Sequence, residues 1–345
     1  MHIVSSLPSF SLGKLTISSG LVLAPMSGVT TRAFRQLISE CSAVGSGLMN
    51  CLGLTVSEFV SVEGMTRGNH RTMDMIARFS DEAPFAVQIF GYDIYRMTEA
   101  ARLVQDSGAD ILDINCGCPA PKVVKRGGGC ELMRQPQHLQ EILRSVRKAV
   151  SIPLTLKMRS GWDSNVKNAV EIAHICEGEG VDGITVHGRT RVELYRGRAD
   201  WGIVREVANS VSIPVCGSGD IVDAASAYLA LHDEDGARNK IAGLYIGRAA
   251  MNDPYIFKRI TSSSSFNRPY DWKLSTMERY VELLEEYLPP TAIPGKIKQL
   301  AAQMGTGEIW AVPICRARSL DEQKVILSEA RLNRCEASHL SMFAK

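Results

Sequence analysis

The sequence of 345 residues lacks several features that define special classes of protein. It contains no uninterrupted run of about 18 apolar residues, the length that a membrane-spanning helix needs. Its first residues, MHIVSSLPSFSLGKL, do not place a long apolar segment after a basic one, as a secretory signal peptide does. Neither sign of charge is in large excess, so the net charge of +2 neither requires nor excludes a polyanionic partner. We therefore expect a soluble, cytoplasmic protein that does not associate with membranes.

The cysteines lack the spacing of a structural metal site. Nine occur in the chain, and an odd number without a signal peptide favours reduced thiols over a disulfide scaffold. Cys116, Cys118 and Cys130 lie in the stretch DINCGCPAPKVVKRGGGCELM, residues 113–133. This stretch has neither paired C-x-x-C motifs nor a histidine, so we predict that it binds no metal. A thiol in it either acts as a proton donor or nucleophile, or packs as a small buried side chain.

Short apolar runs alternate with segments of helical periodicity along the first 250 positions. The eight runs are LVLAPM, GSGLMN, FAVQIFG, ADILDIN, LTLKM, GITVHG, IPVCGSG and GLYIGR. Strands that alternate with helices pair in parallel, and continuous apolar strands are buried on both faces. Eight such units in about 250 residues predict an α/β protein with a (β/α)₈ TIM barrel. A doubly wound sheet is the alternative architecture.

In a barrel of this kind the active site lies at the carboxyl ends of the strands. Polar side chains and glycines follow almost every predicted strand. They are Pro25 and Met26, Gln88, Asn115 to Cys118, Lys157 and Arg159, His187 and Arg189, Gly217 to Asp220, and Gly247 and Arg248. Each alone fits a structural role, such as a hydrogen-bonded core histidine or a solvated lysine. Their convergence at one end of the barrel predicts an active site.

The last two predicted strands end in the glycine-rich turns VCGSGDI and YIGRAAMNDP. Such turns expose backbone N–H groups beside a helix N-terminus, where anions bind. Barrels often bind phosphate in the loops after strands seven and eight, and Arg248 would add a forked, charge-assisted contact. The turns therefore predict a phosphate site, and the alternative is that their glycines only make the turns tight.

Seven motifs, taken in chain order, resemble those of the tRNA-dihydrouridine synthases. They are LAPMSGVTTRAFRQL, VQIFG, DINCGCPAPKVVKRGGG, LKMRSGW, VHGRTRVELYRGRADW, SGDI and IGRAAMNDP, and the match runs from about residue 20 to residue 257. The resemblance implies an FMN-dependent enzyme that uses NADPH to reduce particular uridines of tRNA to dihydrouridine. This reaction adds a hydride to carbon 6 of uracil and a proton to carbon 5, and the base must be flipped out to reach the flavin.

The resemblance also implies roles for single residues. Cys118, directly before a proline, would be the general acid, Asn115 would lie beside the target uracil, and Arg189 falls in a substrate-side motif. The implied flavin contacts are the backbone of Ala24, Pro25 and Met26, the side chains of Gln88, Lys157 and His187 along the ring, and Ser218, Gly219, Asp220, Gly247 and Arg248 around the phosphate. The sequence departs from the family pattern at Ser218 (usually Asn), at Met49-Asn50 after the predicted second strand (usually Thr-Glu), and at Cys116 (usually a bulky apolar residue).

The chain after residue 257 has a different character, so we expect a barrel domain (1–257) and a small helical domain (258–345). SSSSFNRPYDW has the composition of a linker, and TMERYVELLEEYL, GKIKQLAAQMG and SLDEQKVILSEARL have the pattern of amphipathic helices. The tail resembles the family's tRNA-docking domain in position only, and it has 13 Lys and Arg against 10 Asp and Glu. We expect it to hold tRNA, with Lys296, Lys298, Arg316 and Arg318 as basic contacts. The alternative docking surface is the barrel mouth around Lys122, Lys125 and Arg126.

Two other functions fit the same residues. An FMN barrel oxidoreductase could act on a free pyrimidine or another small molecule, which would need no helical tail. A non-catalytic tRNA-binding relative could keep the barrel, but the presence of Cys118, Lys157 and His187 argues against it. The sequence is compatible with a monomer and does not reveal which tRNA position is reduced.

Overall fold

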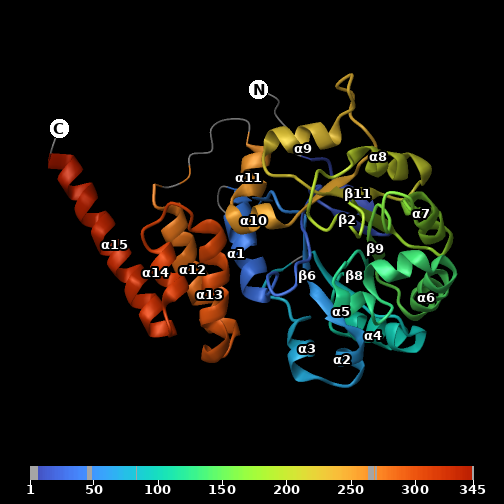
Figure 1. The fold of residues 1–345 in the computed structure, drawn as a ribbon, viewed down its shortest axis with the longest axis horizontal. Helices are drawn as coiled ribbons and strands as arrows, with labels where there is room; N and C mark the ends of the chain where they lie inside the picture. The colour runs from blue at the N-terminus through green and yellow to red at the C-terminus, as the bar shows by residue number, and fades with distance from the viewer. Residues whose placement is uncertain (1–6, 45–48, 83, 263–267, 269, 344–345) are drawn as a thin grey trace.

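The computed structural model describes residues 7–44, 49–82, 84–262, 268 and 270–343. Eight parallel strands form a closed barrel that is surrounded by helices (Figure 1). Around the barrel the strands follow the order β3, β6, β7, β8, β9, β10, β11 and β12, and β12 pairs with β3 to close the ring. The predicted (β/α)₈ TIM barrel is therefore confirmed, and the doubly wound sheet is not formed.

The barrel strands are short and almost wholly buried, because helices cover their outer faces and side chains fill the interior. They span Leu21–Leu23 (β3), Leu54–Ser61 (β6), Phe85–Phe90 (β7), Ile111–Cys116 (β8), Leu154–Arg159 (β9), Gly183–His187 (β10), Val215–Ser218 (β11) and Gly243–Ile246 (β12). An antiparallel hairpin of β1 (Phe10–Leu12) and β2 (Leu15–Ile17) lies at the amino ends of these strands, where Leu12 packs against Gly183. The opposite, carboxyl end is left open for a site.

The second barrel strand is not the one that the sequence predicts. GSGLMN covers residues 45–50, of which 45–48 lie outside the described part of the chain. Met49–Asn50 (β5) pairs antiparallel with Ala43–Val44 (β4), away from the barrel. The true strand is β6, whose sequence LTVSEFVS is longer and rich in β-branched residues. Met49 and Asn50 therefore do not follow the second barrel strand, and the position given for the departure from the family pattern is misplaced.

A β-bulge interrupts β6 beside the interior of the barrel. The pairing of β6 with β7 shifts register between Val56 and Phe59. Inside the bulge the Ser57 hydroxyl accepts a hydrogen bond from the backbone N–H of Gln88 (3.0 Å) and donates one to the Glu58 carbonyl (2.7 Å). Bulges of this kind redirect side chains next to active sites. Here the bulge places Phe59 in the cavity described below.

Some helices of the barrel begin at side chains that accept hydrogen bonds from the first-turn backbone. Thr31, Asp93, Asp200 and Asp223 cap α1, α4, α8 and α9 in this way, as N-cap residues do. The helices span Arg32–Ser42 (α1), Val62–Thr66 (α2), His70–Asp74 (α3), Ile94–Asp106 (α4), Pro121–Val124 (α5), Pro136–Ala149 (α6), Ala169–Gly178 (α7), Trp201–Ser210 (α8), Ala224–Leu231 (α9), Arg248–Asn252 (α10) and Ile256–Thr261 (α11). A 3₁₀ helix, Gly129–Arg134, follows α5.

The C-terminal helices pack on one side of the barrel. They span Trp272–Tyr287 (α12), Ile293–Met304 (α13), Ala311–Arg316 (α14) and Leu320–Phe343 (α15). A 3₁₀ turn, Pro290–Ala292, precedes α13. The three predicted helices are present, whereas α14 lies in the segment that matched no expected pattern. Of the predicted linker at 262–272, residues 263–267 and 269 lie outside the described part of the chain. The boundary expected after residue 257 falls within α11, which packs against α1 and α9.

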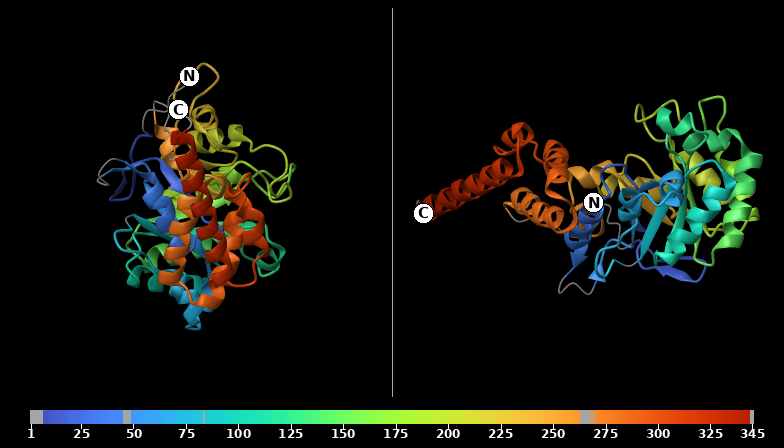
Figure 2. Two further views of the ribbon diagram at one scale, coloured as in Figure 1. Left: turned by 90° about the vertical axis from the view of Figure 1, so that its left-hand side faces the viewer. Right: turned by 90° about the horizontal axis from the view of Figure 1, so that it is seen from below.

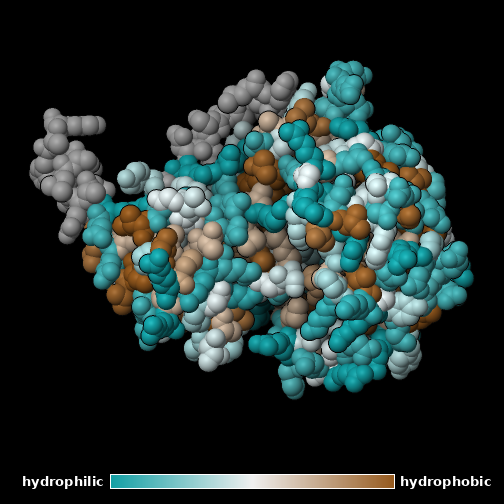
Figure 3. Space-filling view, viewed as in Figure 1, coloured by the Kyte–Doolittle hydropathy of each residue, from teal (hydrophilic) through white to brown (hydrophobic). Residues whose placement is uncertain are grey.

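Polar and aromatic contacts join these helices to the barrel. Arg279 of α12 pairs with Glu40 of α1 (2.8 Å), and the Tyr287 hydroxyl donates to Gln36 (2.6 Å). Figure 2 shows α15 extending as a straight helix beyond the other C-terminal helices. The visible barrel face is largely hydrophilic, and hydrophobic patches also appear over the C-terminal helices (Figure 3). Within the described residues no helix is both long and apolar enough to cross a membrane.

Candidate active site

A cavity of about 910 Å³ lies at the carboxyl end of the barrel. Its volume is within the range of cofactor and small-molecule sites. The predicted site residues that line it are Ala24, Pro25, Met26, Gln88, Asn115, Cys118, Lys157, His187, Ser218, Gly219, Asp220, Gly247 and Arg248. These residues come from seven of the eight barrel strands or the loops that follow them, and β6 adds Phe59. Of the predicted set, Arg189 does not line the cavity.

The three cysteines of the DINCGCPAPKVVKRGGGC stretch have different surroundings. Cys118 lines the cavity and is 8% exposed, whereas Cys116 and Cys130 are buried away from it. Burial raises the pKa of the Cys118 thiol above its usual value, so the thiol keeps its proton at neutral pH. Burial also raises the pKa of Cys130 to about 12. The eight cysteines of the described chain form no disulfide with one another.

Asn115 shapes the turn that carries Cys118. Its side-chain oxygen accepts hydrogen bonds from the backbone N–H groups of Gly117 (3.1 Å) and Cys118 (2.9 Å). Its amide group donates to the side-chain oxygen of Gln88 (2.7 Å). Asn115 therefore lies in the cavity wall as predicted, and its polar atoms already have partners within the protein.

Three cationic side chains give the cavity a positive potential. Burial, followed by the nearby charge of Arg159, lowers the pKa of Lys157 to about 8. Arg159 donates hydrogen bonds to the carbonyls of Gly117, Thr190 and Leu194, and thereby ties the loops after β8 and β10 together. Arg248 lies over the ring of Tyr195, at 4.6 Å from its centroid. No carboxylate of the described residues forms an ion pair with these three cations.

We expect the Lys157 amine to titrate near pH 8 in the flavin-free protein, because its pKa is lowered from 10.5 to about 8. Only the unprotonated amine reacts with an acylating reagent, so the acetylation rate at Lys157 should rise with its midpoint near that pH. Mass spectrometry of the labelled peptide measures this rate, and the exposed Lys14 controls for the reagent. A midpoint close to 10.5 would contradict the lowered pKa.

His187 is neutral and presents a donor to the cavity. Its Nδ1 atom accepts a hydrogen bond from the backbone N–H of Arg189 (3.2 Å), so Nε2 carries the proton. Burial, together with the surrounding cations, lowers the pKa of His187 to about 2. A neutral imidazole with a free Nε2–H offers a hydrogen bond without adding charge.

Arg189 stabilises the turn after β11 by hydrogen bonds to Asp220. This arginine is 2% exposed, and its guanidinium donates to both carboxylate oxygens of Asp220 (2.8 Å each) and to the carbonyls of Arg196 and Gly197. Asp220 adopts a left-handed backbone conformation with φ of 57°. The Nε and Nη2 atoms of Arg189 are thus directed at the protein itself, Nη1 is buried without a partner among the described residues, and the side chain lies outside the cavity wall. It holds the turn that lines the cavity.

The two glycine-rich turns have little room for a side chain at their glycines. A Cβ atom at Gly219, where φ is 125°, would meet the Ala199 side chain at 2.5 Å. A Cβ atom at Gly247 would lie 3.3 Å from the sulfur of Met26. The Ser218 hydroxyl, in place of the usual asparagine, donates to the Tyr245 carbonyl (3.2 Å). Glycine turns whose backbone lines the cavity, beside unpaired cations and a neutral imidazole, fit a phosphate-bearing, ring-shaped cofactor.

Several lining residues were not predicted from the sequence. Phe59 reaches the cavity through the bulge of β6, and Leu194 and Tyr195 reach it from the long loop after β10. Gln303 of α13 also lines it, so the C-terminal helices contribute to its mouth. An aromatic residue between arginines in RVELYRGR is the one available sequence signal for Tyr195.

A family profile described as "Dihydrouridine synthase (Dus)" matches residues 22–305, which covers the barrel together with α12 and α13. The chain belongs to the dihydrouridine synthase family. This dihydrouridine synthase is 40% identical to a "Probable tRNA-dihydrouridine synthase" of Rhodobacter capsulatus over 280 residues, which are 81% of this chain and 82% of the relative. It is also 40% identical to "tRNA-dihydrouridine synthase B" of Pseudomonas syringae pv. tomato over 249 residues, which are 72% of this chain and 70% of that one.

One solved structure shares the barrel of this dihydrouridine synthase. It is a 2-naphthoyl-CoA reductase in complex with 2-naphthoyl-CoA, with a TM-score of 0.54 and 16% sequence identity. The similarity covers 74% of this chain and 52% of the reductase. At this level of identity the likeness concerns the fold alone. The family assignment rests on the profile and on the curated relatives, and it makes this protein a flavin-dependent oxidoreductase.

Proposed function

We propose that this dihydrouridine synthase reduces the 5,6 double bond of specific uridines in tRNA, with FMN as the bound flavin, NADPH as the reductant and Cys118 as the proton donor. The observation that carries the proposal is the position of Cys118. It is a protonated thiol that reaches a cavity whose other charged lining groups are mainly cations. A cytoplasmic location, where tRNA is modified, forms part of this proposal.

The chain offers two groups of residues to hold FMN. The turns at Ser218–Asp220 and Gly247–Arg248 would hold the phosphate, and Arg248 is exposed and has no carboxylate partner among the described residues. The segment Ala24–Met26, together with Gln88, Lys157 and His187, would hold the ring. When bound, FMN supplies the hydride that carbon 6 of uracil receives.

The chain's own residues supply the proton and the electrostatic environment. Cys118 donates the proton on Sγ to carbon 5, which completes the reduction of the double bond. The positive charge of Arg159 favours the thiolate that remains, and a proton from water restores the thiol. The ammonium form of Lys157 stabilises negative charge that develops in the cavity, as preorganised cations do. The Nε2–H of His187 orients an acceptor without competing for the proton.

The substrate must enter the cavity as a single flipped base. A uridine within folded tRNA is stacked, and enzymes that modify a base draw it into a pocket. The cavity opens among loops that carry the exposed side chains of Tyr195 and Arg248. These groups provide an aromatic surface and a cation at the mouth, which suits nucleic acid better than an uncharged small molecule.

The proposal is tested with the purified, flavin-loaded protein and NADPH. Dihydrouridine is quantified in bulk tRNA from a strain that lacks the modification, and reduction of free uridine is measured in parallel. We expect dihydrouridine to accumulate at defined tRNA positions with little reduction of free uridine. Efficient reduction of free uridine instead would support the small-molecule alternative, and binding of tRNA without any reduction would support the non-catalytic one.

We further propose a two-part organisation in which residues from about 258 onward help to hold tRNA. The structure changes the choice of basic contacts, because the Lys296 amine donates to the carbonyl of Gly28 (2.5 Å) and is partly buried. Lys296 therefore joins α13 to the loop after β3. Arg316 and Arg318 are exposed, and Lys298 lies with Cys315 in a hollow that also includes Gly28. This hollow joins the C-terminal helices to the loop at the barrel mouth.

Reversing the charges of Lys298, Arg316 and Arg318 together should weaken tRNA binding. Each phosphate contact releases counterions, so losing three contacts should reduce the log–log salt slope of the affinity by about 2 to 3. Filter binding at a series of salt concentrations measures both quantities. Reversal of Lys14, Lys148 and Lys240 is the matched control, because these exposed lysines lie in loops or helix ends at the amino end of the barrel. If neither variant lost affinity, the docking surface would be the barrel mouth around Lys122, Lys125 and Arg126, and if only the control did, it would be the amino end of the barrel.

A further inference from the structure

Asp113 is a buried carboxylate that the proposed reaction does not use. It lies on β8 directly between Gln88 of β7 and Thr155 of β9, and it is 1% exposed. Its Oδ2 atom accepts a hydrogen bond from the Gln88 amide (2.5 Å), and its Oδ1 atom accepts one from the Thr155 hydroxyl (2.6 Å). Asp113 does not line the cavity, whereas Gln88 does. The carboxyl group therefore acts on the cavity through its hydrogen-bonded neighbours and through its electrostatic effect on Lys157.

A chain of hydrogen bonds leads from Asp113 to Cys118. Because the Oδ2 atom of Asp113 accepts this hydrogen bond, Gln88 turns its NH₂ group toward Asp113 and its oxygen away. That oxygen then accepts from the NH₂ group of Asn115 (2.7 Å). The Asn115 oxygen is consequently the atom that faces the backbone N–H groups of Gly117 and Cys118. Each amide has one donor end and one acceptor end, so the orientation of the Gln88 amide determines the orientation of the Asn115 amide that matches it.

We propose that Asp113 is a positioning residue for Cys118. The acceptor that it offers orients the Gln88 amide and, through it, the Asn115 amide, whose oxygen holds the turn that carries the thiol. The role of Cys118 as proton donor rests on the function proposed above, but the hydrogen-bond chain does not. Without Asp113 the NH₂ group of Gln88 has no acceptor, and a Gln88 amide that turned to find one would set its NH₂ group against that of Asn115.

The flavin-loaded Asp113→Leu variant tests this relay. Its side chain offers no acceptor to Gln88, so the turn should be released more often and the thiol should become more accessible. We expect alkylation of Cys118 by iodoacetamide, followed by mass spectrometry, to accelerate roughly fivefold or more, as the loss of one ordinary hydrogen bond allows. The exposed Cys315 serves as an internal reference for the reagent.

Two further variants separate positioning from general loosening. Thr155→Val removes a hydrogen bond to the same carboxylate without interrupting the chain, so Cys118 should react at nearly the wild-type rate. Adding Gln88→Glu to Asp113→Leu places a carboxylate at the next position of the hydrogen-bond chain. There it accepts from the NH₂ group of Asn115 and restores the orientation of the Asn115 amide. We expect this double variant to recover most of the protection of Cys118. If it does not, or if buried Cys116 and Cys130 accelerate as much as Cys118, the proposal is overturned.

A second route applies if Asp113→Leu does not fold. Asp113→Asn combined with Thr155→Val is close to isosteric at both positions. With the Thr155 hydroxyl removed, the NH₂ group of the new amide can find an acceptor only in the oxygen of Gln88. This variant should accelerate Cys118 alkylation to a similar degree relative to Thr155→Val alone, and an unchanged rate would refute the relay. Turnover of tRNA uridine is measured alongside, and its kcat should fall with NADPH oxidation by the flavin maintained. If the wild-type protein did not reduce tRNA uridine, the proposed function would be contradicted, but the alkylation rates would still test the hydrogen-bond chain.

Discussion

Replacing Cys118 with alanine should slow the reduction of tRNA uridine by about 10²–10⁴-fold, the usual effect of losing a general acid. The thiol lines the cavity and keeps its proton because burial raises its pKa. The cation-lined wall that would hold the flavin is untouched by the substitution, so NADPH should still reduce the bound flavin at a similar rate. Stopped-flow absorbance follows the flavin, and single-turnover assays with tRNA follow dihydrouridine.

The matched control is the neighbouring cysteine of the same C-x-C pair. Cys116 is fully buried in the apolar core beneath the strands, so Cys116→Ala should retain tRNA reduction and lose some stability through the small cavity left behind. Both variants remove one sulfur from the same C-x-C pair. A difference in tRNA activity between them therefore reports the position of the thiol and not the loss of a cysteine as such. Equal losses of tRNA activity in the two variants, with flavin retained in both, would disprove a unique role for Cys118.

The sequence predicts the part of the site that lies at strand ends. In a parallel barrel every strand ends at the same face, so the residue after a strand is placed by the fold itself. Gln88, Lys157 and His187 follow apolar runs, and all three line the cavity. The prediction of the second strand is wrong because GSGLMN and the true strand LTVSEFVS lie only a few residues apart, and both are short apolar runs.

Contacts that depend on loop conformation could not be predicted in this way. Leu194 adopts a left-handed backbone with φ of 53°, beside Tyr195 at the cavity mouth. A pattern of residue types does not show where such a loop turns. For the same reason Arg189 was expected to face the substrate, whereas it donates to Asp220 and to backbone carbonyls. Lys296 was expected to be a free surface charge, and its partner Gly28 is 268 positions away in the sequence.

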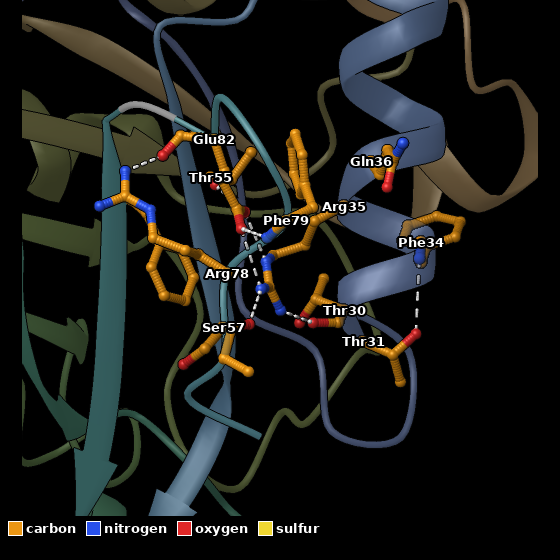
Figure 4. Close-up of polar contacts among 12 residues, drawn as sticks. Thr30, Thr31, Phe34, Arg35, Gln36, Thr55, Ser57, Arg78, Phe79 and Glu82 are labelled. Atoms are coloured by element: carbon orange, nitrogen blue, oxygen red, sulfur yellow. Dashed lines mark hydrogen bonds and ion pairs between the residues drawn. The ribbon is translucent and has the colours of Figure 1, made fainter. Parts of the chain in front are cut away.

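The largest expected effect on stability comes from an ion pair buried between α1 and the barrel (Figure 4). The side chains of Arg35 and Glu82 are each 1% exposed, and Arg35 Nε lies 2.7 Å from the carboxylate. Glu82 also accepts from the Thr55 hydroxyl (2.6 Å) and the backbone N–H of Phe79 (3.1 Å). Arg35 further donates to the carbonyl of Thr30 (3.0 Å), in the loop after β3. The pair therefore links α1, β6 and the segment before β7 to a loop that lines the cavity.

Glu82→Gln should lower the free energy of unfolding by about 3–5 kcal/mol, because it leaves a buried guanidinium without its counter-charge. Arg35→Met should cost a similar amount, since it leaves the carboxylate unpaired. Urea unfolding followed by far-ultraviolet circular dichroism measures the loss, with the FMN concentration fixed because bound ligand adds stability. As a control, Glu285→Gln removes the charge of an exposed ion pair with Lys324. The side chain of Lys324 is 45% exposed and that of Glu285 is 39% exposed. That change should cost no more than about 1 kcal/mol.

The double variant Arg35→Met with Glu82→Gln distinguishes a coupled pair from two independent side chains. If the charges stabilise each other, removing both leaves no unpaired charge, and the double variant should lose less than the sum of the single losses by about 0.5–3 kcal/mol. Some loss remains, because the Thr30 carbonyl and the Phe79 N–H lose charged partners that were buried with them. Additive losses would show that Arg35 and Glu82 act separately through these other partners. The pairing of the two charges would then not be the source of stability.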